Sequence, residues 1–149
     1  MNSDNGHSAR PPLITSLIGR LHIRIRKECD KIFRQQGFPV EMDQIPVLAL
    51  LYYKDGLSQQ EICSCLQRDK ASVNRTVSFL SKRDMAKVVQ DVTDKRKTRV
   101  ELTAAGKELA IQVDAVVKKV DTILTSALTE KEVEQFYTLT NKLIETSFT

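Results

Sequence analysis

Two short capped helices that follow each other almost without a break constrain the fold of this chain most strongly. Ser58, with Glu61 three residues later, forms a capping-box pattern that predicts a helix ending near Leu66. Asp69 is the predicted N-cap of the next helix. That helix carries an apolar stripe at one-turn spacing, formed by Val73, Val77 and Leu80. Two short helices joined by so brief a turn predict a helix-turn-helix motif.

The residue pattern changes from helical to strand-like after this motif. Residues 88–92 and 99–102 are rich in β-branched side chains, and the charged stretch 93–97 between them suits the tip of a hairpin. Strands that follow a helix-turn-helix form a wing. The expected fold is therefore mainly α with a small two- or three-stranded β wing, a winged helix-turn-helix between about residues 42 and 103.

A long amphipathic helix is predicted before this unit, and a short helix at its start. Apolar residues at spacings of three and four mark the long helix over residues 11–36, with Pro12 in its first turn and Gly37 at its end. The short helix covers roughly residues 43–53. Its Pro46 is tolerable only in the first turn, which makes the start of this helix uncertain.

Two further helices are predicted within residues 104–149. Thr103 is the expected cap of the first, and Thr129 with Glu132 forms a second capping-box pattern before the last. Both helices, like the long helix before the unit, carry apolar stripes that must be buried against something. They can pack on their own domain, or they can interlock with a second copy of the chain and create two-fold symmetry.

Length and composition fit a single domain over residues 11–149. With 41% hydrophobic and 28% charged residues, the sequence is typical of a globular protein. No stretch is long and apolar enough to span a membrane. Residues 1–10 form a polar tail, expected to be disordered, that lacks the apolar run of a secretory signal. We therefore expect a cytoplasmic protein without membrane contact.

Residues that could support metal binding, redox chemistry or catalysis are few. Cys29, Cys63 and Cys65 are an odd number and are expected to be ordinary thiols, although a redox role stays open. His7 and His22 are too few for a zinc site, so no metal is expected. No glycine-rich phosphate loop or nucleophile elbow is present in the sequence. We therefore expect no catalytic residue and no enzyme activity.

Basic residues are concentrated in the predicted winged helix-turn-helix. The stretch from Arg68 to Thr103 holds ten Lys or Arg against five Asp or Glu, a net charge of +5 in a chain whose total is +4. A basic block inside a folded unit is typical of a surface that binds a polyanion such as DNA. The charge alone fits a solvated, lysine-rich surface equally well.

The second helix of a helix-turn-helix enters the major groove of DNA with its N-terminal half facing the bases. Val73 and Val77 are expected to turn inward. The residues expected to bind DNA from this helix are Lys70, Ser72, Asn74, Arg75 and Thr76. Arginine can donate two hydrogen bonds to guanine, asparagine can pair with adenine, and a lysine at a helix start favours phosphate.

The predicted hairpin tip supplies a second basic set. The residues expected to reach an adjacent minor groove are Arg96, Lys97 and Arg99, next to Lys95. Asp94, two residues before Arg96, is expected to position its guanidinium by charge-assisted hydrogen bonds. A basic hairpin tip by itself is a weak signal, because edge strands commonly carry lysine.

The order of these motifs resembles the MarR (multiple-antibiotic-resistance regulator) family over about residues 42–110. The similar segments are Asp69-Lys70-Ala71-Ser72-Val73-Asn74-Arg75, then Lys82-Arg83-Asp84-Met85, then Asp94-x-Arg96-x5-Leu102-Thr103. Two positions depart from the family pattern. Ala71 stands where many relatives have serine, and Asp84 stands where glycine is usual, so we expect Asp84 to tolerate a left-handed backbone.

The resemblance implies a homodimer whose terminal helices, about 11–36 and 104–149, form the interface. It also implies a helix in the major groove of double-stranded DNA and a wing arginine, here Arg96, in the minor groove. Many relatives are repressors released by thiol oxidation or by small phenolic or other aromatic ligands. An effector of that kind is expected in a cleft lined by the first, second and fifth helices, and no other cofactor is expected.

The expected function is thus a sequence-specific, ligand-responsive repressor that binds a palindromic operator as a homodimer. The alternative is a winged-helix adaptor that binds another protein and reads no DNA sequence. Arg75 and Arg96 distinguish these two interpretations, because an adaptor has no need of outward arginines on both the helix and the wing.

Overall fold

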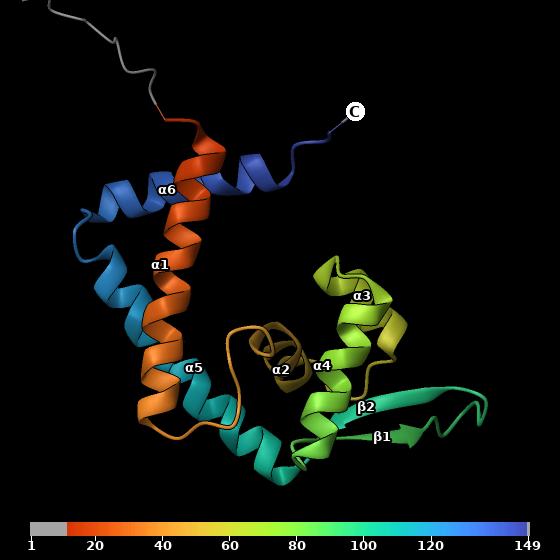
Figure 1. Cartoon of the computed structure of the whole chain (residues 1–149). Coiled ribbons are helices and arrows are strands. Elements are labelled where there is room, and N and C mark those ends of the chain that lie inside the picture. Colours follow the sequence, from red (N-terminus) through yellow and green to blue (C-terminus); the bar gives the residue numbers. More distant parts are fainter. Residues whose placement is uncertain (1–11, 149) are drawn as a thin grey trace, which may run out of the picture.

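The computed structural model describes residues 12–148, and in this range the chain forms six helices and one two-stranded antiparallel sheet (Figure 1). In chain order these are α1 (Ile14–Gln35), α2 (Ile45–Tyr53), α3 (Gln59–Leu66), α4 (Lys70–Lys82), β1 (Ala86–Gln90), β2 (Thr98–Leu102), α5 (Ala104–Thr125) and α6 (Glu130–Ile144). The mainly α fold class with a β wing is therefore confirmed. The tail predicted for residues 1–10 lies outside the described residues.

The two helices before the helix-turn-helix begin later than the sequence pattern suggests. α1 begins at Ile14 after Leu13 as N-cap, so Pro12 precedes the helix instead of lying in its first turn. Gly37 ends it with a φ of +68°, a left-handed conformation that glycine adopts without strain, as predicted. α2 begins at Ile45, which places Pro46 in the first turn, where its missing N–H costs no helical hydrogen bond.

The helix-turn-helix caps are those that the sequence predicts. The Ser58 hydroxyl accepts the Glu61 backbone N–H while the Glu61 carboxylate accepts the Ser58 backbone N–H. The carboxylate of Asp69 accepts the backbone N–H of Ser72 at 2.8 Å and so starts α4. Between the two helices, Gln67 adopts a left-handed φ of 50°, which turns the chain sharply.

The wing is a two-stranded hairpin in which Val88 pairs with Val100. Its first strand begins two residues earlier than predicted and ends at Gln90, because the chain then enters the loop 91–97. The third strand that the sequence left open is reduced to a single bridge between Leu57 and Val100. Loop residues 93–97 therefore project beyond a short, regular hairpin (Figure 1).

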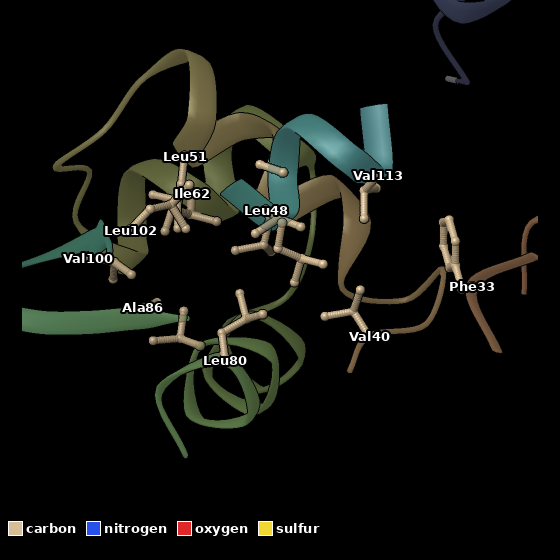
Figure 2. Packing of buried hydrophobic residues seen from close by; sticks show 14 of the residues in the cluster. Phe33, Val40, Leu48, Leu51, Ile62, Leu80, Ala86, Val100, Leu102 and Val113 are labelled. Atoms are coloured by element: carbon tan, nitrogen blue, oxygen red, sulfur yellow. The ribbon is translucent and has the colours of Figure 1, made fainter. Parts of the chain in front are cut away.

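A continuous apolar core joins α2, α3, α4, the wing and α5, and we call residues 45–102 the winged-helix unit. Figure 2 shows Leu48, Leu80, Val100 and Leu102 converging on this core from different elements. α1 contributes Phe33 at its edge. Each such side chain stabilises the folded state by about 1.5–3 kcal/mol when it is fully buried. The core therefore fixes how α4 and the wing are oriented relative to each other.

The two terminal helices, α1 and α6, are far less buried than the winged-helix unit. α1 buries only Cys29 and Phe33, and α6 buries none of its residues in the described chain. Exposed large apolar side chains on α1 and α6 include Ile14, Leu17, Ile18, Ile23, Phe136, Leu139, Leu143 and Ile144. α6 lies at the end of the molecule away from the wing (Figure 1). No helix within residues 12–148 combines the length and apolarity needed to cross a membrane.

Candidate DNA-binding surface

The buried face of α4 decides which of the predicted DNA-binding residues face outward. Val73, Val77 and Leu80 are buried there, as predicted. The expectation that Thr76 also faces outward is wrong, because its side chain is only 6% exposed. With 3.6 residues per turn, position 76 falls within the same stripe as 73, 77 and 80, so Thr76 packs with the core side of the helix.

The opposite face of α4 is an exposed stripe centred on Arg75. At about 100° per residue, Ala71, Arg75, Ser78 and Lys82 share one face of the helix, and all four are exposed. The sequence analysis singled out Arg75 and missed Ser78, although the spacing of three from Arg75 could have revealed it. We define these four residues as the outer stripe.

Three other predicted contacts lie on the flanks of the outer stripe. Lys70 and Asn74 lie on one side and are exposed, whereas Ser72 lies on the other side and is half-buried. Their exposure allows contact with a ligand along the whole N-terminal half of α4. Contact of these residues with DNA stays a prediction.

An open hollow of about 370 Å³ lies on the Ser72 flank of α4. It is lined by Asp43, Gln44, Arg68, Ser72, Arg75, Thr76 and Phe79. A terminal nitrogen of Arg68 donates a hydrogen bond to the Asp43 carbonyl at 3.1 Å. The Asp43 carboxylate accepts two hydrogen bonds from the guanidinium of Arg26 in α1, at 2.9 and 3.1 Å. Sequence patterns did not indicate Arg68, because its position in the turn belongs to no periodic stripe.

At the wing tip, Asp94 and Arg96 form the contact that the sequence predicts. One Asp94 carboxylate oxygen lies 3.3 Å from Nε of Arg96 and also accepts the Arg96 backbone N–H at 3.0 Å. The Arg96 side chain remains 92% exposed. Lys95 and Lys97 are exposed beside it. The tip is therefore a basic projection in which one arginine is anchored at its base and free at its end.

Arg99 has a different environment from the other wing cations. Its Nε donates to the carboxylate of Asp91 at the base of the loop. The other oxygen of Asp91 accepts hydrogen bonds from the hydroxyl and backbone N–H of Thr93 and from the backbone N–H of Asp94. These donors, Thr93 first and Arg99 last, hold the pKa of the Asp91 carboxyl well below its usual range. Arg99 thus helps to hold the loop, in addition to any DNA contact.

Asp91 was not among the residues selected from the sequence. An aspartate two residues before a threonine is a pattern in which the carboxylate often accepts backbone N–H groups of the following turn, and this pattern could have revealed it. Asp91 is only 8% exposed, so its carboxylate acts inside the protein. It positions the loop that carries Asp94 and Arg96.

The cysteines show no arrangement that suggests chemistry. Cys29 is buried, and burial, followed by the nearby carboxylates of Asp30 and Glu28, raises the pKa of its thiol. Cys63 is half-buried and Cys65 is exposed. Among residues 12–148, no three His, Cys, Asp or Glu side chains gather as a metal site requires.

A small slot of about 80 Å³ lies between α2 and α5. It is lined by Ile45, Leu48, Ala49, Tyr52, Tyr53, Ala110, Val113, Asp114 and Val117. Asp114 pairs with Lys118 at 2.6 Å, so the one carboxylate in this lining is neutralised. α1 contributes no residue to the slot, in contrast to the predicted lining by the first, second and fifth helices.

Comparison with known proteins agrees with this architecture. The MarR family model matches residues 36–97, from the end of α1 to the wing tip. The chain is 25% identical over 134 residues to the HTH-type transcriptional repressor NicR of Pseudomonas putida, covering 89% of this chain and 85% of that protein.

Solved structures show the same fold over nearly the whole chain. The S. aureus MepR–DNA complex is 24% identical with a TM-score of 0.82, covering 90% of this chain and 98% of that one. PcaV from Streptomyces coelicolor, in complex with its natural ligand, is 19% identical with a TM-score of 0.72, covering 91% and 97%. The family model thus covers the helix-turn-helix and much of the wing, and over this part the chain is similar to the MarR family.

Proposed function

We propose that this protein is a sequence-specific DNA-binding transcriptional regulator, a repressor that binds a palindromic operator as a homodimer. The observation that carries this proposal is the outer stripe of α4, which exposes Arg75 on a helix whose opposite face is locked into the core. Such a helix presents a rigid arginine to the major groove, where guanine offers two acceptors. The repressor NicR and the DNA complex of MepR support this assignment.

The wing is proposed as the second DNA contact. Arg96 projects from a loop that Asp91 and Asp94 hold in place, so little conformational entropy is lost when its guanidinium enters a groove. Arginine is favoured in a narrow minor groove because the negative potential is strongest there. The helix would then read bases while the wing reads groove shape.

The homodimer is proposed from the terminal helices. α6 buries no residue within the described chain, yet Phe136, Leu139 and Leu143 are each about half exposed or more. α1 adds further exposed apolar side chains at helical spacing. Exposed apolar stripes of this kind are typical of an interface. A two-fold dimer through it would present two copies of α4 to half-sites about 34–36 Å apart.

An effector, where one exists, is proposed to be a small aromatic molecule that enters the slot between α2 and α5. The slot is mostly apolar, with the two tyrosine rings of Tyr52 and Tyr53 at its edge. At about 80 Å³ it is smaller than the roughly 150 Å³ that an engineered cavity offers to benzene. Binding would therefore have to separate α2 from α5, and that movement would reach the helix-turn-helix.

The same function implies a cytoplasmic protein without enzyme activity, because a bacterial regulator works where the chromosome lies and carries out no reaction. The similarity to MarR-family regulators supports both inferences.

Selection of bound duplexes from a random DNA pool tests the proposal. We expect enrichment of a two-fold symmetric sequence, and we expect affinity for it to exceed affinity for random DNA by at least about 10³-fold. A mobility shift over a salt series gives the second readout. Equal, weak binding to all duplexes would contradict the proposal and favour a winged-helix adaptor.

A further inference from the structure

The hollow beside α4 lies where a DNA backbone would pass. A helix inserted in the major groove has its outer face against base edges and its flanks close to the phosphates of the two strands. Ser72 and Phe79 lie on one flank of the outer stripe and form one wall of the hollow. A group bound in the hollow therefore has the position of a backbone phosphate when Arg75 faces the bases.

The lining of the hollow offers donors to an anion. Arg68 uses one terminal nitrogen for the Asp43 carbonyl, and its remaining N–H groups are available for a second acceptor. The side-chain oxygen of Gln44 accepts the Glu41 backbone N–H, which leaves its amide N–H groups to donate. The Ser72 hydroxyl lies in the same lining. These are the donor types that bind phosphate oxygens in protein–DNA complexes.

The one carboxylate in the hollow, that of Asp43, is already neutralised by an arginine that does not line the hollow. Asp43 accepts two hydrogen bonds from Arg26 of α1, and Asp30 of α1 accepts the backbone N–H of Met42 at 3.0 Å. Contacts with α1 thus fix residues 42–43, and the carbonyl of Asp43 in turn binds Arg68. Charges around the hollow then favour an anion, since Arg68 and Arg75 have no carboxylate partner among the described ion pairs.

The opposite end of the hollow is also positive. The guanidinium of Arg83, at the C-cap of α4, lies 3.6 Å from the centre of the Phe79 ring that lines the hollow. Stacking on an aromatic ring holds this cation at the rim without using its N–H donors. The flank of α4 therefore has a cation near each end, Arg68 at its start and Arg83 at its end.

We propose that the hollow is a phosphate-binding site for the DNA backbone, with Arg68 as the phosphate ligand and Gln44 and Ser72 as additional donors. The proposal rests on the proposed function, because the phosphate belongs to DNA docked on the outer stripe. It adds a contact outside α4 and the wing. Through Asp43 and Arg26 it also connects this contact to α1, one of the proposed dimer helices.

Single uncharged phosphates test this site. Duplexes of the selected operator, each with one methylphosphonate linkage, are titrated against the full-length protein by fluorescence anisotropy over a salt series. The variants are Arg68→Gln, Arg68→Lys and, as a matched control, Arg34→Gln, which removes the same charge from an exposed position at the end of α1. Melting temperatures measured alongside show whether each variant is folded.

Arg68→Gln is expected to weaken operator and random DNA equally, by about tenfold per half-site, and to lower the salt slope by about 0.9 per half-site. Arg68→Lys should keep most of the slope. One methylphosphonate position per half-site should weaken the parent protein and weaken Arg68→Gln much less, because only the contacts of Gln44 and Ser72 remain there. If Arg68→Gln matches Arg34→Gln, or every methylphosphonate effect persists in it, the site is wrong. A parent protein that selects no operator would instead overturn the proposed function.

Discussion

The winged-helix unit and the terminal helices differ in how far one chain can bury its apolar residues. The unit encloses Leu48, Leu80 and Val100 almost completely, with elements that are short but packed on several sides. α6 is a well-capped helix of 15 residues with no buried residue. Local helix signals are therefore equally strong in both regions, whereas tertiary burial is present in only one. The unit buries its apolar residues within one chain, whereas α1 and α6 leave theirs exposed, as the proposed homodimer requires.

The comparison predicts that the same substitution has different consequences in the two regions. Leu80→Ala removes a fully buried side chain and should lower the free energy of unfolding by about 2–5 kcal/mol. Leu139→Ala, at a position 60% exposed in the single chain, should instead weaken the dimer and make the melting temperature depend on protein concentration. Urea unfolding and light scattering at several concentrations measure these effects.

The mass measured by light scattering is the control for the Leu139→Ala result. The parent protein should scatter as twice the 16.9 kDa chain at micromolar concentration, and Leu139→Ala should approach one chain on dilution. Leu139→Ala behaving like the parent at every concentration would remove α6 from the interface and end the contrast between the two regions.

Two glycines differ in the same way, one packed against backbone and one in open space. A Cβ at Gly106, in the first turn of α5, would lie 1.9 Å from the Met85 carbonyl oxygen, so Gly106→Ala must displace backbone and should cost about 2–3 kcal/mol. A Cβ at Gly19, in the second turn of α1, would meet no atom within 4 Å, and Gly19→Ala should stabilise the helix by up to about 1 kcal/mol. Thermal melting measures both. A destabilising Gly19→Ala would instead show that a second copy packs closely there.

Within the winged-helix unit, the wing loop depends on one carboxylate. Because folding lowers the pKa of Asp91, its contribution to the order of the loop is fully present above its unfolded pKa of about 3.9. That contribution is lost only as the pH falls below this value. The amide NMR signals of Thr93 and Asp94 should therefore stay unchanged from pH 7 to pH 5.

Asp91→Asn should loosen the loop at all pH values and weaken binding to A·T-rich flanks a few-fold, without changing the half-site sequence. Loop signals that broaden in the parent between pH 7 and pH 5, or an Asn variant with ordered loop amides, would contradict this role of Asp91.

The smallest expected effect concerns the turn between α4 and β1. Asp84 has a φ of +56°, a left-handed conformation that costs a residue with a Cβ roughly 1 kcal/mol. Asp84→Gly should therefore raise the free energy of unfolding by about 0.5–1 kcal/mol. Gly37→Ala, at φ +68° with open space around it, should lower the free energy of unfolding by a similar amount. If both changes leave the free energy of urea unfolding unchanged, the left-handed backbone at Asp84 and Gly37 does not affect stability.

Much of the fold could be predicted because local signals and burial agree. The caps at Ser58, Asp69, Thr103 and Thr129 all mark true helix starts, since each side chain satisfies a backbone N–H that nothing else reaches. The left-handed backbone of Asp84 was also predicted, from the glycine that the MarR family usually has at this position. Strand boundaries were less accurate, because β-branched residues continue into the loop as Val92.

The candidate site was predicted less completely than the fold. Periodicity identified the stripe at Arg75, but polar Thr76 was assigned outward because its residue type was weighed above its helical position. Arg68 was missed because its role depends on Asp43, 25 residues away, which the fold brings close. Asp91 was missed although its partner Thr93 is only two residues away, because a turn contact of this kind has no helical or strand period. Such contacts carry no periodic signal in a single sequence.

We propose that α4 reads DNA bases while the wing reads groove shape, and the decisive quantity is the ratio of operator affinity to random-DNA affinity. Arg75→Ala should reduce this ratio by a factor that corresponds to about 1–3 kcal/mol of binding free energy, because a bidentate guanine contact is lost. Arg96→Ala should weaken binding to both DNAs, lower the salt slope by roughly one phosphate-equivalent and reduce any preference for A·T-rich flanks. If both variants bind operator and random DNA as the parent does, neither surface touches DNA, and the protein acts as an adaptor.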